Sequence, residues 1–177
     1  LFDKDYFTED FEGKRDKIII EILYGTGIRL SEMLDLKMTD INYSQNMIRV
    51  RGKGNKDRMI PVHNELVSSI KAYSKMRGKK LRGNDNNYLI LKNDGQKAYP
   101  VFIYRVVKKY LEMITTEEKK SPHVLRHTFA THLLNKGADL NAIKDLLGHE
   151  NLAATQVYTH NSLEQLKSIF KKAHPKA

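Results

Sequence analysis

The sequence contains no cysteine, no long hydrophobic run and comparatively few acidic residues. Without cysteine, this chain forms no disulfides, thiol nucleophiles or cysteine-based zinc or iron–sulfur sites. None of its apolar runs approaches the roughly 18 residues that span a membrane, and no secretory signal peptide is recognisable. These absences favour a protein of the reducing cytoplasm that does not enter a membrane.

The deficit of acidic residues leaves a strong positive charge. The 31 Lys and Arg exceed the 21 Asp and Glu, which gives a formal net charge of +10. Such a surplus indicates a polyanionic partner, most often nucleic acid. A solvated basic surface without a partner is the alternative. The 177 residues suit one domain with its own core.

Hydrophobic periodicity, capping residues and glycines predict a mostly helical α+β domain. Helices are expected over 14–27, 29–36, 65–77, 101–114, 121–137, 140–147, 151–157 and 163–173. Two β-rich runs flank the basic segment GKGNKD and predict a β-hairpin over 47–62. A third strand at 88–91 completes a small antiparallel sheet, and 77–87 is expected to be a loop.

The stretch SPHVLRHTFATHLLNKG, residues 121–137, carries the clearest chemical signal. His123 and Arg126 are expected in the first turn of a helix, where free N–H groups and the helix dipole favour an anion. A planar guanidinium can hold two phosphate oxygens, and a histidine can move a proton near neutral pH. A surface arginine beside a capping histidine is an equally good reading of this segment alone.

A metal site in the same stretch is disfavoured. His123 and His127 share a helical face, but Arg126 lies between them and would repel a dication. His127 and His132 share the helix with hydrophobic residues and are expected to be buried and hydrogen-bonded.

Other short stretches add candidates that are weak when taken singly. Arg29 follows a glycine turn at a helix start, and Lys53 lies at the hairpin tip. His149 follows Gly148 directly, and Tyr158 comes shortly after it.

In this order the candidates resemble the tyrosine recombinases, which include phage and transposon integrases and the Xer-type chromosome-dimer resolvases. The family pattern is Arg, a hairpin Lys, His-x-x-Arg, Leu-Gly-His and Tyr, and it is filled by Arg29, Lys53, His123, Arg126, His149 and Tyr158. The resemblance runs from about Arg15 to the C-terminus. It implies the catalytic-domain fold of the DNA breaking-rejoining enzymes, with residues 1–177 as the C-terminal catalytic domain and no counterpart of the family's N-terminal core-binding domain.

The resemblance also implies site-specific recombination or integration of DNA through a 3′-phosphotyrosine. Tyr158 would be the nucleophile, His123 its general base and Lys53 the general acid, while Arg29 and Arg126 hold the phosphate oxygens. His149 would hydrogen-bond the phosphate. No metal or other cofactor is expected, because the arginines provide the charge and the phosphotyrosine stores the bond energy.

Four further residues are expected to support this site. Glu32 and Asp40 are candidates for holding Arg29, with a helix-cap or surface role as the alternative. Lys56 and Arg58 are expected to touch the DNA backbone.

The partners implied are double-stranded DNA and further copies of the protein, as a homotetramer on two DNA sites, alone or with a paralogous recombinase. The tail helix in 162–177 would then be exchanged between protomers, with packing on its own domain as the alternative. A bacterial, cytoplasmic, nucleoid-associated enzyme is expected. A type IB topoisomerase and a non-catalytic DNA-binding protein are the competing readings.

Overall fold

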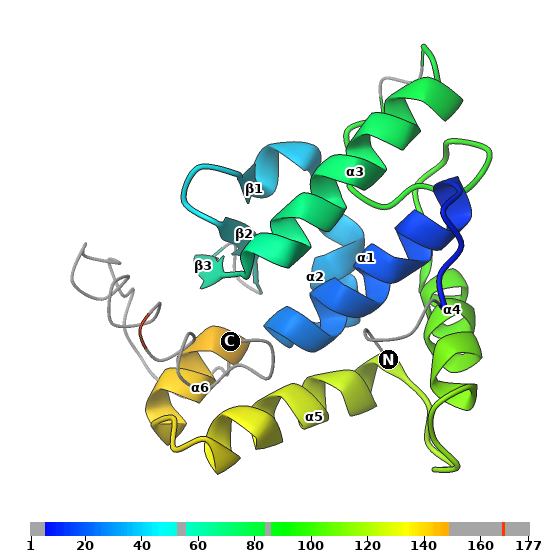
Figure 1. Cartoon of the computed structure of the whole chain (residues 1–177). Coiled ribbons are helices and arrows are strands. Elements are labelled where there is room, and N and C mark those ends of the chain that lie inside the picture. Colours follow the sequence, from blue (N-terminus) through cyan, green and yellow to red (C-terminus); the bar gives the residue numbers. More distant parts are fainter. Residues whose placement is uncertain (1–5, 53–55, 84–85, 149–167, 169–177) are drawn as a thin grey trace.

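The computed structural model describes residues 6–52, 56–83, 86–148 and Ser168, and it is mainly helical (Figure 1). In chain order its elements are α1 (Phe11–Thr26), α2 (Leu30–Asp35), the short 3₁₀ helix η1 (Met38–Asp40), β1 (Ile41–Asn42), β2 (Met47–Arg51), β3 (Asp57–Pro61), α3 (Asn64–Lys80), α4 (Pro100–Glu112), α5 (Pro122–Asn135) and α6 (Leu140–Leu147). The predicted fold class, mostly helical with a small antiparallel sheet, is confirmed. None of the helices in this described part is long and apolar enough to cross a bilayer.

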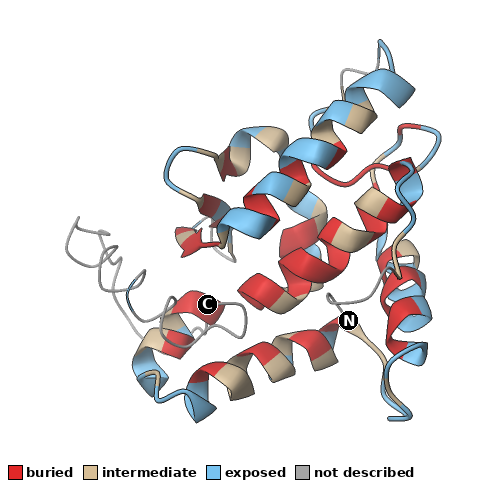
Figure 2. Cartoon of the chain, in the orientation of Figure 1, coloured by how far each residue is buried: buried red, intermediate tan, exposed pale blue. Residues whose placement is uncertain are grey.

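Helix α1 forms the centre of the domain, and α3, α4 and α5 pack around it. Residues 18–20, 22 and 23 are isoleucine or leucine, each at most 1% exposed. Because consecutive helix residues point in different directions, this run shows that residues 18–23 of α1 are enclosed on all sides (Figure 2). The helix starts before the predicted residue 14, since the Asp10 side chain accepts a 2.8 Å hydrogen bond from the Gly13 N–H and caps it.

The sheet contains the predicted hairpin but a different third strand. Its order is β1-β2-β3 with antiparallel pairing, and Val50 of β2 faces Arg58 of β3. The short strand β1 pairs with β2, with Ile41 facing Ile48. At the turn end of the hairpin the Gly52 N–H donates to the Lys56 carbonyl at 2.8 Å, so the strands stay paired up to residues 53–55.

The strand predicted at 88–91 is wrong. Residues 89–91 are buried, but the chain bends at 89 and 90 and forms only isolated bridges, from Lys37 to Tyr88 and from Leu91 to Lys97. Its amides are satisfied elsewhere, because the Leu89 N–H donates to the Leu36 carbonyl at 2.7 Å. The predicted loop 77–87 also begins late, since α3 continues to Lys80.

Helix α6 begins and ends at the residues that the sequence marks, and α5 begins at the marked proline but ends at Asn135, two residues before Gly137. Helix α5 starts at Pro122, although the Ser121 side chain makes no capping hydrogen bond. The Asp139 side chain caps α6 by accepting from the Asn141 and Ala142 amides, and Gly148 ends α6 with φ 66°. The helices predicted over 151–157 and 163–173 lie outside the described residues, Ser168 apart.

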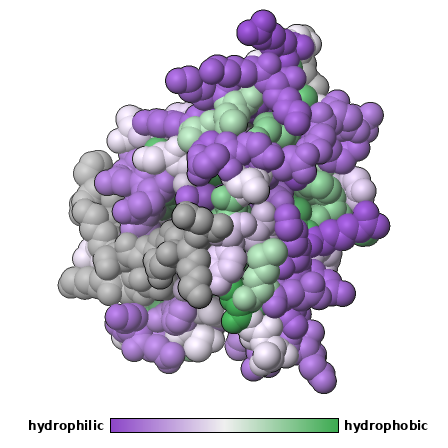
Figure 3. Space-filling model, turned by 45° about the vertical axis from the view of Figure 1, so that its right-hand side comes forward, coloured by the Kyte–Doolittle hydropathy of each residue, from purple (hydrophilic) through white to green (hydrophobic). Residues whose placement is uncertain are grey.

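Hydrophilic side chains cover most of the face drawn in Figure 3, and hydrophobic ones form small separate patches. The described large hydrophobic residues are mostly in the core, and the exposed exceptions are Tyr99, Val101, Tyr104, Met113, Ile114, Leu134 and Leu140.

Gly27 ends α1 and sets its distance from α5 and α6. It has φ 61°, a left-handed conformation that favours glycine. A methyl group on it would lie 2.4 Å from Phe129 Cδ1 and 2.8 Å from Leu147 Cδ2. The end of α1 therefore approaches α5 and α6 as closely as a glycine allows.

We expect Gly27→Ala to lower the free energy of unfolding by about 3 kcal/mol, because left-handed strain adds to overpacking. Gly137→Ala is the matched control. Gly137 has φ 79°, and a methyl group on it would meet nothing within 4 Å, so only strain of about 1 kcal/mol is expected. Urea denaturation measures both, and equal losses would contradict the tight contact at Gly27.

Candidate active site

Three arginines from three parts of the chain meet at the C-terminal end of α6. Each donates to one of three successive carbonyls: Arg58 Nε to Leu146 at 2.8 Å, Arg126 Nη2 to Leu147 at 2.9 Å, and Arg29 Nη2 to Gly148 at 2.8 Å. The last carbonyls of a helix have no partner within it and carry the negative end of its dipole. The three cations therefore satisfy the end of α6, and the end of α6 holds the three cations together.

Arg29 is fixed by its position at the start of α2. It is the residue before the helix, and Glu32 accepts from its backbone N–H at 2.8 Å and from its Nη1 at 3.1 Å. The Arg29 side chain is still 38% exposed. Its guanidinium is thus held in place on one side and accessible on the other.

Glu32 also forms a buried ion pair with Arg58. The two side chains meet through two parallel hydrogen bonds of 2.8 Å, and each residue is 6% exposed. Burial acts to raise the pKa of Glu32, but the hydrogen bonds and charge of Arg58, with those of Arg29, outweigh it and lower that pKa. Glu32 is therefore an anion that pairs with two arginines. Its contact with Arg29 was expected from the sequence, and its contact with Arg58 was not.

The structure corrects the expectation that Arg58 touches the DNA backbone. Arg58 is buried, whereas Lys56, proposed for the same role, is exposed. A signal for this was present in the sequence, because Arg58 and the buried Ile60 are two residues apart on β3 and so share a face.

Arg126 is a half-buried cation next to another cation. Its Nη1 donates to the Gly27 carbonyl, and its Nη2 to Leu147. Burial, followed by repulsion from Arg29, lowers the pKa of Arg126 to about 10. The guanidinium remains charged at neutral pH, and a bound anion would relieve the repulsion. Arg29 and Arg126 therefore place two charged guanidiniums at one helix end, an arrangement that is suited to an anionic ligand.

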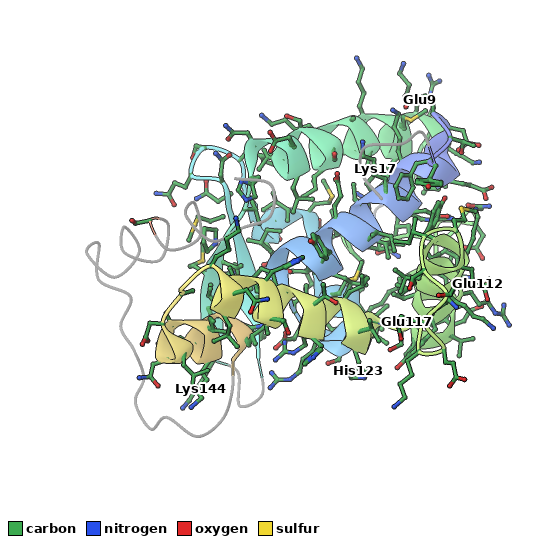
Figure 4. The ribbon with its side chains drawn as sticks, turned by 60° about the horizontal axis from the view of Figure 1, so that its bottom comes forward. Glu9, Lys17, Glu112, Glu117, His123 and Lys144 are labelled. Carbon is green, nitrogen blue, oxygen red and sulfur yellow. The ribbon has the colours of Figure 1, made fainter. Side chains whose placement is uncertain are left out.

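His123 lies at the beginning of α5, exposed at the surface of the molecule (Figure 4). It is three residues before Arg126, so both belong to one side of the helix. Among the described residues its imidazole has no hydrogen-bond partner.

Three predicted site residues, Lys53, His149 and Tyr158, lie outside the described residues. Their neighbours in the chain are described: Gly52 at the end of the hairpin precedes Lys53, and Gly148 at the end of α6 precedes His149. The structure thus brings together Arg29, Arg126 and Glu32.

Asp40 does not hold Arg29. Its carboxylate accepts from Arg49 Nη2 at 2.6 Å and from the Lys37 N–H at 2.9 Å, so it caps η1 and pairs with β2. The expectation for Asp40 is corrected, because a helix cap and a strand arginine already occupy its oxygens.

The expectations for the two remaining histidines have different outcomes. His127 is exposed, so the prediction that it is buried is wrong. His132 is half-buried, and its Nδ1 is hydrogen-bonded to the Tyr24 hydroxyl at 3.0 Å. Among the described residues no three His, Asp or Glu side chains gather as metal ligands would.

Comparisons with known proteins agree on one family. The model of the phage integrase family matches residues 5–165. The tyrosine recombinase XerC of Chlorobaculum parvum is 39% identical over 172 residues, which cover 94% of this chain and 51% of that protein. XerC of Pelobacter propionicus is 44% identical over 169 residues, covering 96% of this chain and 55% of that protein. This chain spans about half the length of these curated relatives.

A solved structure agrees as well. The crystal structure of the XerH site-specific recombinase bound to its difH substrate, a pre-cleavage complex, has a TM-score of 0.72 and 30% identity, over 90% of this chain and 46% of that chain.

Glu32→Ala should lower the free energy of unfolding by about 4 kcal/mol, since it leaves the buried Arg58 charge without its partner. The control is Glu112→Ala on α4 (Figure 4), whose exposed pair with Lys108 spans 3.8 Å and should change stability by less than about 0.5 kcal/mol. Guanidinium chloride denaturation compares them.

The effect of Glu32→Ala should depend on pH in one direction. Because the folded pKa of Glu32 is lowered, its contribution is present above the ordinary carboxyl pKa and is lost as the pH falls through the lowered value. A difference between wild type and variant that grows on acidification would contradict the buried carboxylate.

Sulfate should raise the melting temperature more than chloride at equal ionic strength, because it can occupy the site between Arg29 and Arg126. At about 100 times its Kd the gain in stability is about 2.7 kcal/mol. Arg126→Met should abolish the sulfate-specific shift, and the exposed Arg105→Met on α4 should keep it. Equal shifts in both variants would argue against an anion site at Arg126.

Proposed function

The chain belongs to the phage integrase family, and we propose that it cleaves and rejoins DNA at specific sites through a covalent tyrosine intermediate. The observation that carries the proposal is the pair Arg29 and Arg126, anchored on the carbonyls of Gly148 and Leu147, which are one and two residues before His149. Residues 1–177 would act as the catalytic domain of such a recombinase.

The two arginines would bind the non-bridging oxygens of the scissile phosphate. A phosphodiester gathers negative charge on these oxygens in the transition state, and fixed cations stabilise that charge without reorganising. Arg29 is partly exposed and Arg126 is half-buried, so a phosphate can reach both while their carbonyl contacts keep them in place. Burial, and after it repulsion from Arg29, lowers the pKa of Arg126, and an anion bound between the two guanidiniums would offset both effects.

The proposed cleavage step exchanges one phosphorus–oxygen bond for another. The Tyr158 oxygen attacks phosphorus as its proton passes to His123, and the bond to the 5′-oxygen breaks. Lys53 gives that oxygen its proton, leaving a 3′-phosphotyrosine and a free 5′-hydroxyl. His149 would hydrogen-bond the phosphate. A 5′-hydroxyl of another duplex reverses the step, so the proposal needs neither a metal nor a nucleotide cofactor.

Double-stranded DNA is the proposed partner. The net charge of +10 and the exposed Lys56 beside the hairpin tip support binding to a phosphate backbone. The XerH relative is described as bound to a DNA substrate. By the same analogy we propose a homotetramer on two DNA sites, alone or with a paralogous recombinase, with the tail 162–177 exchanged between protomers. A bacterial cytoplasm, in association with the nucleoid, is the proposed location.

Adduct capture tests this function. The protein is expressed in bacteria and purified under denaturing conditions, and any attached DNA is sequenced, with Tyr158→Phe alongside. We expect adducts at one recurrent site, and none from Tyr158→Phe, because a phenyl ring has no oxygen to attack with. Tyr104→Phe, at an exposed tyrosine on α4, is the matched control and should keep its adducts.

The other outcomes identify the competing functions. Adducts scattered over many sequences would favour a type IB topoisomerase. Wild-type protein that binds DNA without forming any adduct would favour a non-catalytic DNA-binding protein. Adducts that persist in Tyr158→Phe would contradict Tyr158 as the nucleophile.

A further inference from the structure

Arg58 joins the hairpin to both sides of the anion site. It lies on β3, its fork pairs with Glu32 on α2, and its Nε donates to the Leu146 carbonyl at the end of α6. With 6% of its surface exposed, it is enclosed by the elements that it connects.

We propose that Arg58 is a positioning residue, which sets Arg29, the turn end of the hairpin at Gly52 and the last turn of α6 in one arrangement. This inference rests on the proposed function, because its importance lies in the groups on these three elements that would act on DNA. Arg58 itself is too deeply buried to touch a phosphate.

The carboxylate of Glu32 is fully occupied by two arginines. Its Oε1 accepts from Arg58 Nη1 at 2.8 Å and from Arg29 Nη1 at 3.1 Å. Its Oε2 accepts from Arg58 Nη2 at 2.8 Å and from the Arg29 N–H at 2.8 Å. A carboxylate has about four acceptor positions, so all are used. Arg58 therefore fixes the orientation of Glu32, and through it that of Arg29.

The Arg58–Glu32 pair also lies against two glycines, the first of which is Gly148. A methyl group on Gly148 would lie 3.1 Å from Arg58 Nη1 and 3.2 Å from its Cζ, and Gly148 has φ 66°. The guanidinium thus lies directly against the backbone at the point where the chain leaves α6. The next residue in the sequence is His149.

Gly52 approaches the same pair from the hairpin. A methyl group there would lie 3.7 Å from Arg58 Nη1 and 3.9 Å from Glu32 Oε1. The next residue is Lys53. The chain therefore starts toward Lys53 and toward His149 from two glycines that border one buried ion pair, which also holds Arg29.

The shape of the arginine side chain matters here as much as its charge. A planar fork makes the two parallel bonds to Glu32 while Nε remains free for Leu146. A lysine at this position keeps the charge but cannot reproduce the three fixed directions. Replacing Arg58 by lysine therefore distinguishes a positioning role, which needs the fork, from a purely electrostatic role, which needs only the charge.

The first test uses inorganic sulfate as the probe. The sulfate affinity of wild type, Arg58→Lys, Arg58→Met and Arg49→Lys is obtained from melting temperatures at constant ionic strength. Positioning predicts at least about tenfold weaker affinity in both Arg58 variants. Arg49→Lys is the matched control, because Arg49 is on the same hairpin but pairs with Asp40 at the surface, and it should stay close to wild type.

Two results would overturn the proposal. The first is an Arg58→Lys variant that binds sulfate as wild type does. If Arg58→Met is then impaired, Arg58 acts through its charge alone, and if it is not, Arg58 has no effect on the anion site. The absence of any sulfate-specific shift in wild type would remove the anion site that Arg58 is proposed to arrange.

The second test separates positioning from stability and from the proposed function. On the duplex recovered by adduct sequencing, Arg58→Lys should cleave about 100-fold more slowly in a single turnover, with unchanged DNA affinity. Unchanged cleavage, or an equal loss in binding and rate, would contradict positioning. Should wild type form no adduct while both Arg58 variants lose sulfate binding, the recombinase function fails and the positioning role stands.

A measurement on the wild-type protein tests the proposal even if the Arg58 variants do not fold. In ¹⁵N spectra of the sulfate-free protein, the Arg58 Nε–H should exchange slowly with solvent, because Leu146 already holds it. Fast exchange that slows only when sulfate binds would show that the anion arranges Arg58, and would overturn the proposal.

Discussion

The last turn of α6 needs hydrogen-bond donors that the helix cannot supply, and three arginines provide them. Arg58, Arg126 and Arg29 each bind one of three successive carbonyls. The stabilisation is mutual. The arginines donate to the free carbonyls, and the negative end of the helix dipole reduces the repulsion between the three cations. Among the residues that the structure describes, one carboxylate, that of Glu32, pairs with two of these three arginines, so positive charge is in excess there. That excess makes the site suited to an anion.

The rest of the fold brings these groups within reach of α6. The enclosed helix α1 ends at Gly27, whose carbonyl accepts from Arg126 and whose lack of a side chain lets Phe129 and Leu147 approach. The hairpin carries Arg58 on its inner face. Sequence-distant parts of the chain thus converge on one helix end, and the chain continues from that end toward His149 and Tyr158.

Local signals in the sequence predicted much of this fold, and they failed where tertiary contacts decide. Pro122, Asp139 and Gly148 marked helix boundaries correctly, because capping depends on neighbouring residues. The strand predicted at 88–91 is wrong, since the Leu89 amide donates to the Leu36 carbonyl and the Leu91 amide to the Tyr73 hydroxyl on α3, rather than to the sheet. Arg58 and Asp40 were misassigned for the same reason: the partner of a charged side chain can come from a distant element, which local sequence does not reveal.

The most direct test of tyrosine-mediated cleavage is to locate the DNA attachment on the protein. Protein trapped on DNA is digested with nuclease and protease, and tandem mass spectrometry finds the residue that carries the remaining nucleotide. The proposed function predicts a nucleotide joined through its 3′-phosphate to Tyr158. A nucleotide on any other residue, or on none while the protein binds DNA, would contradict it.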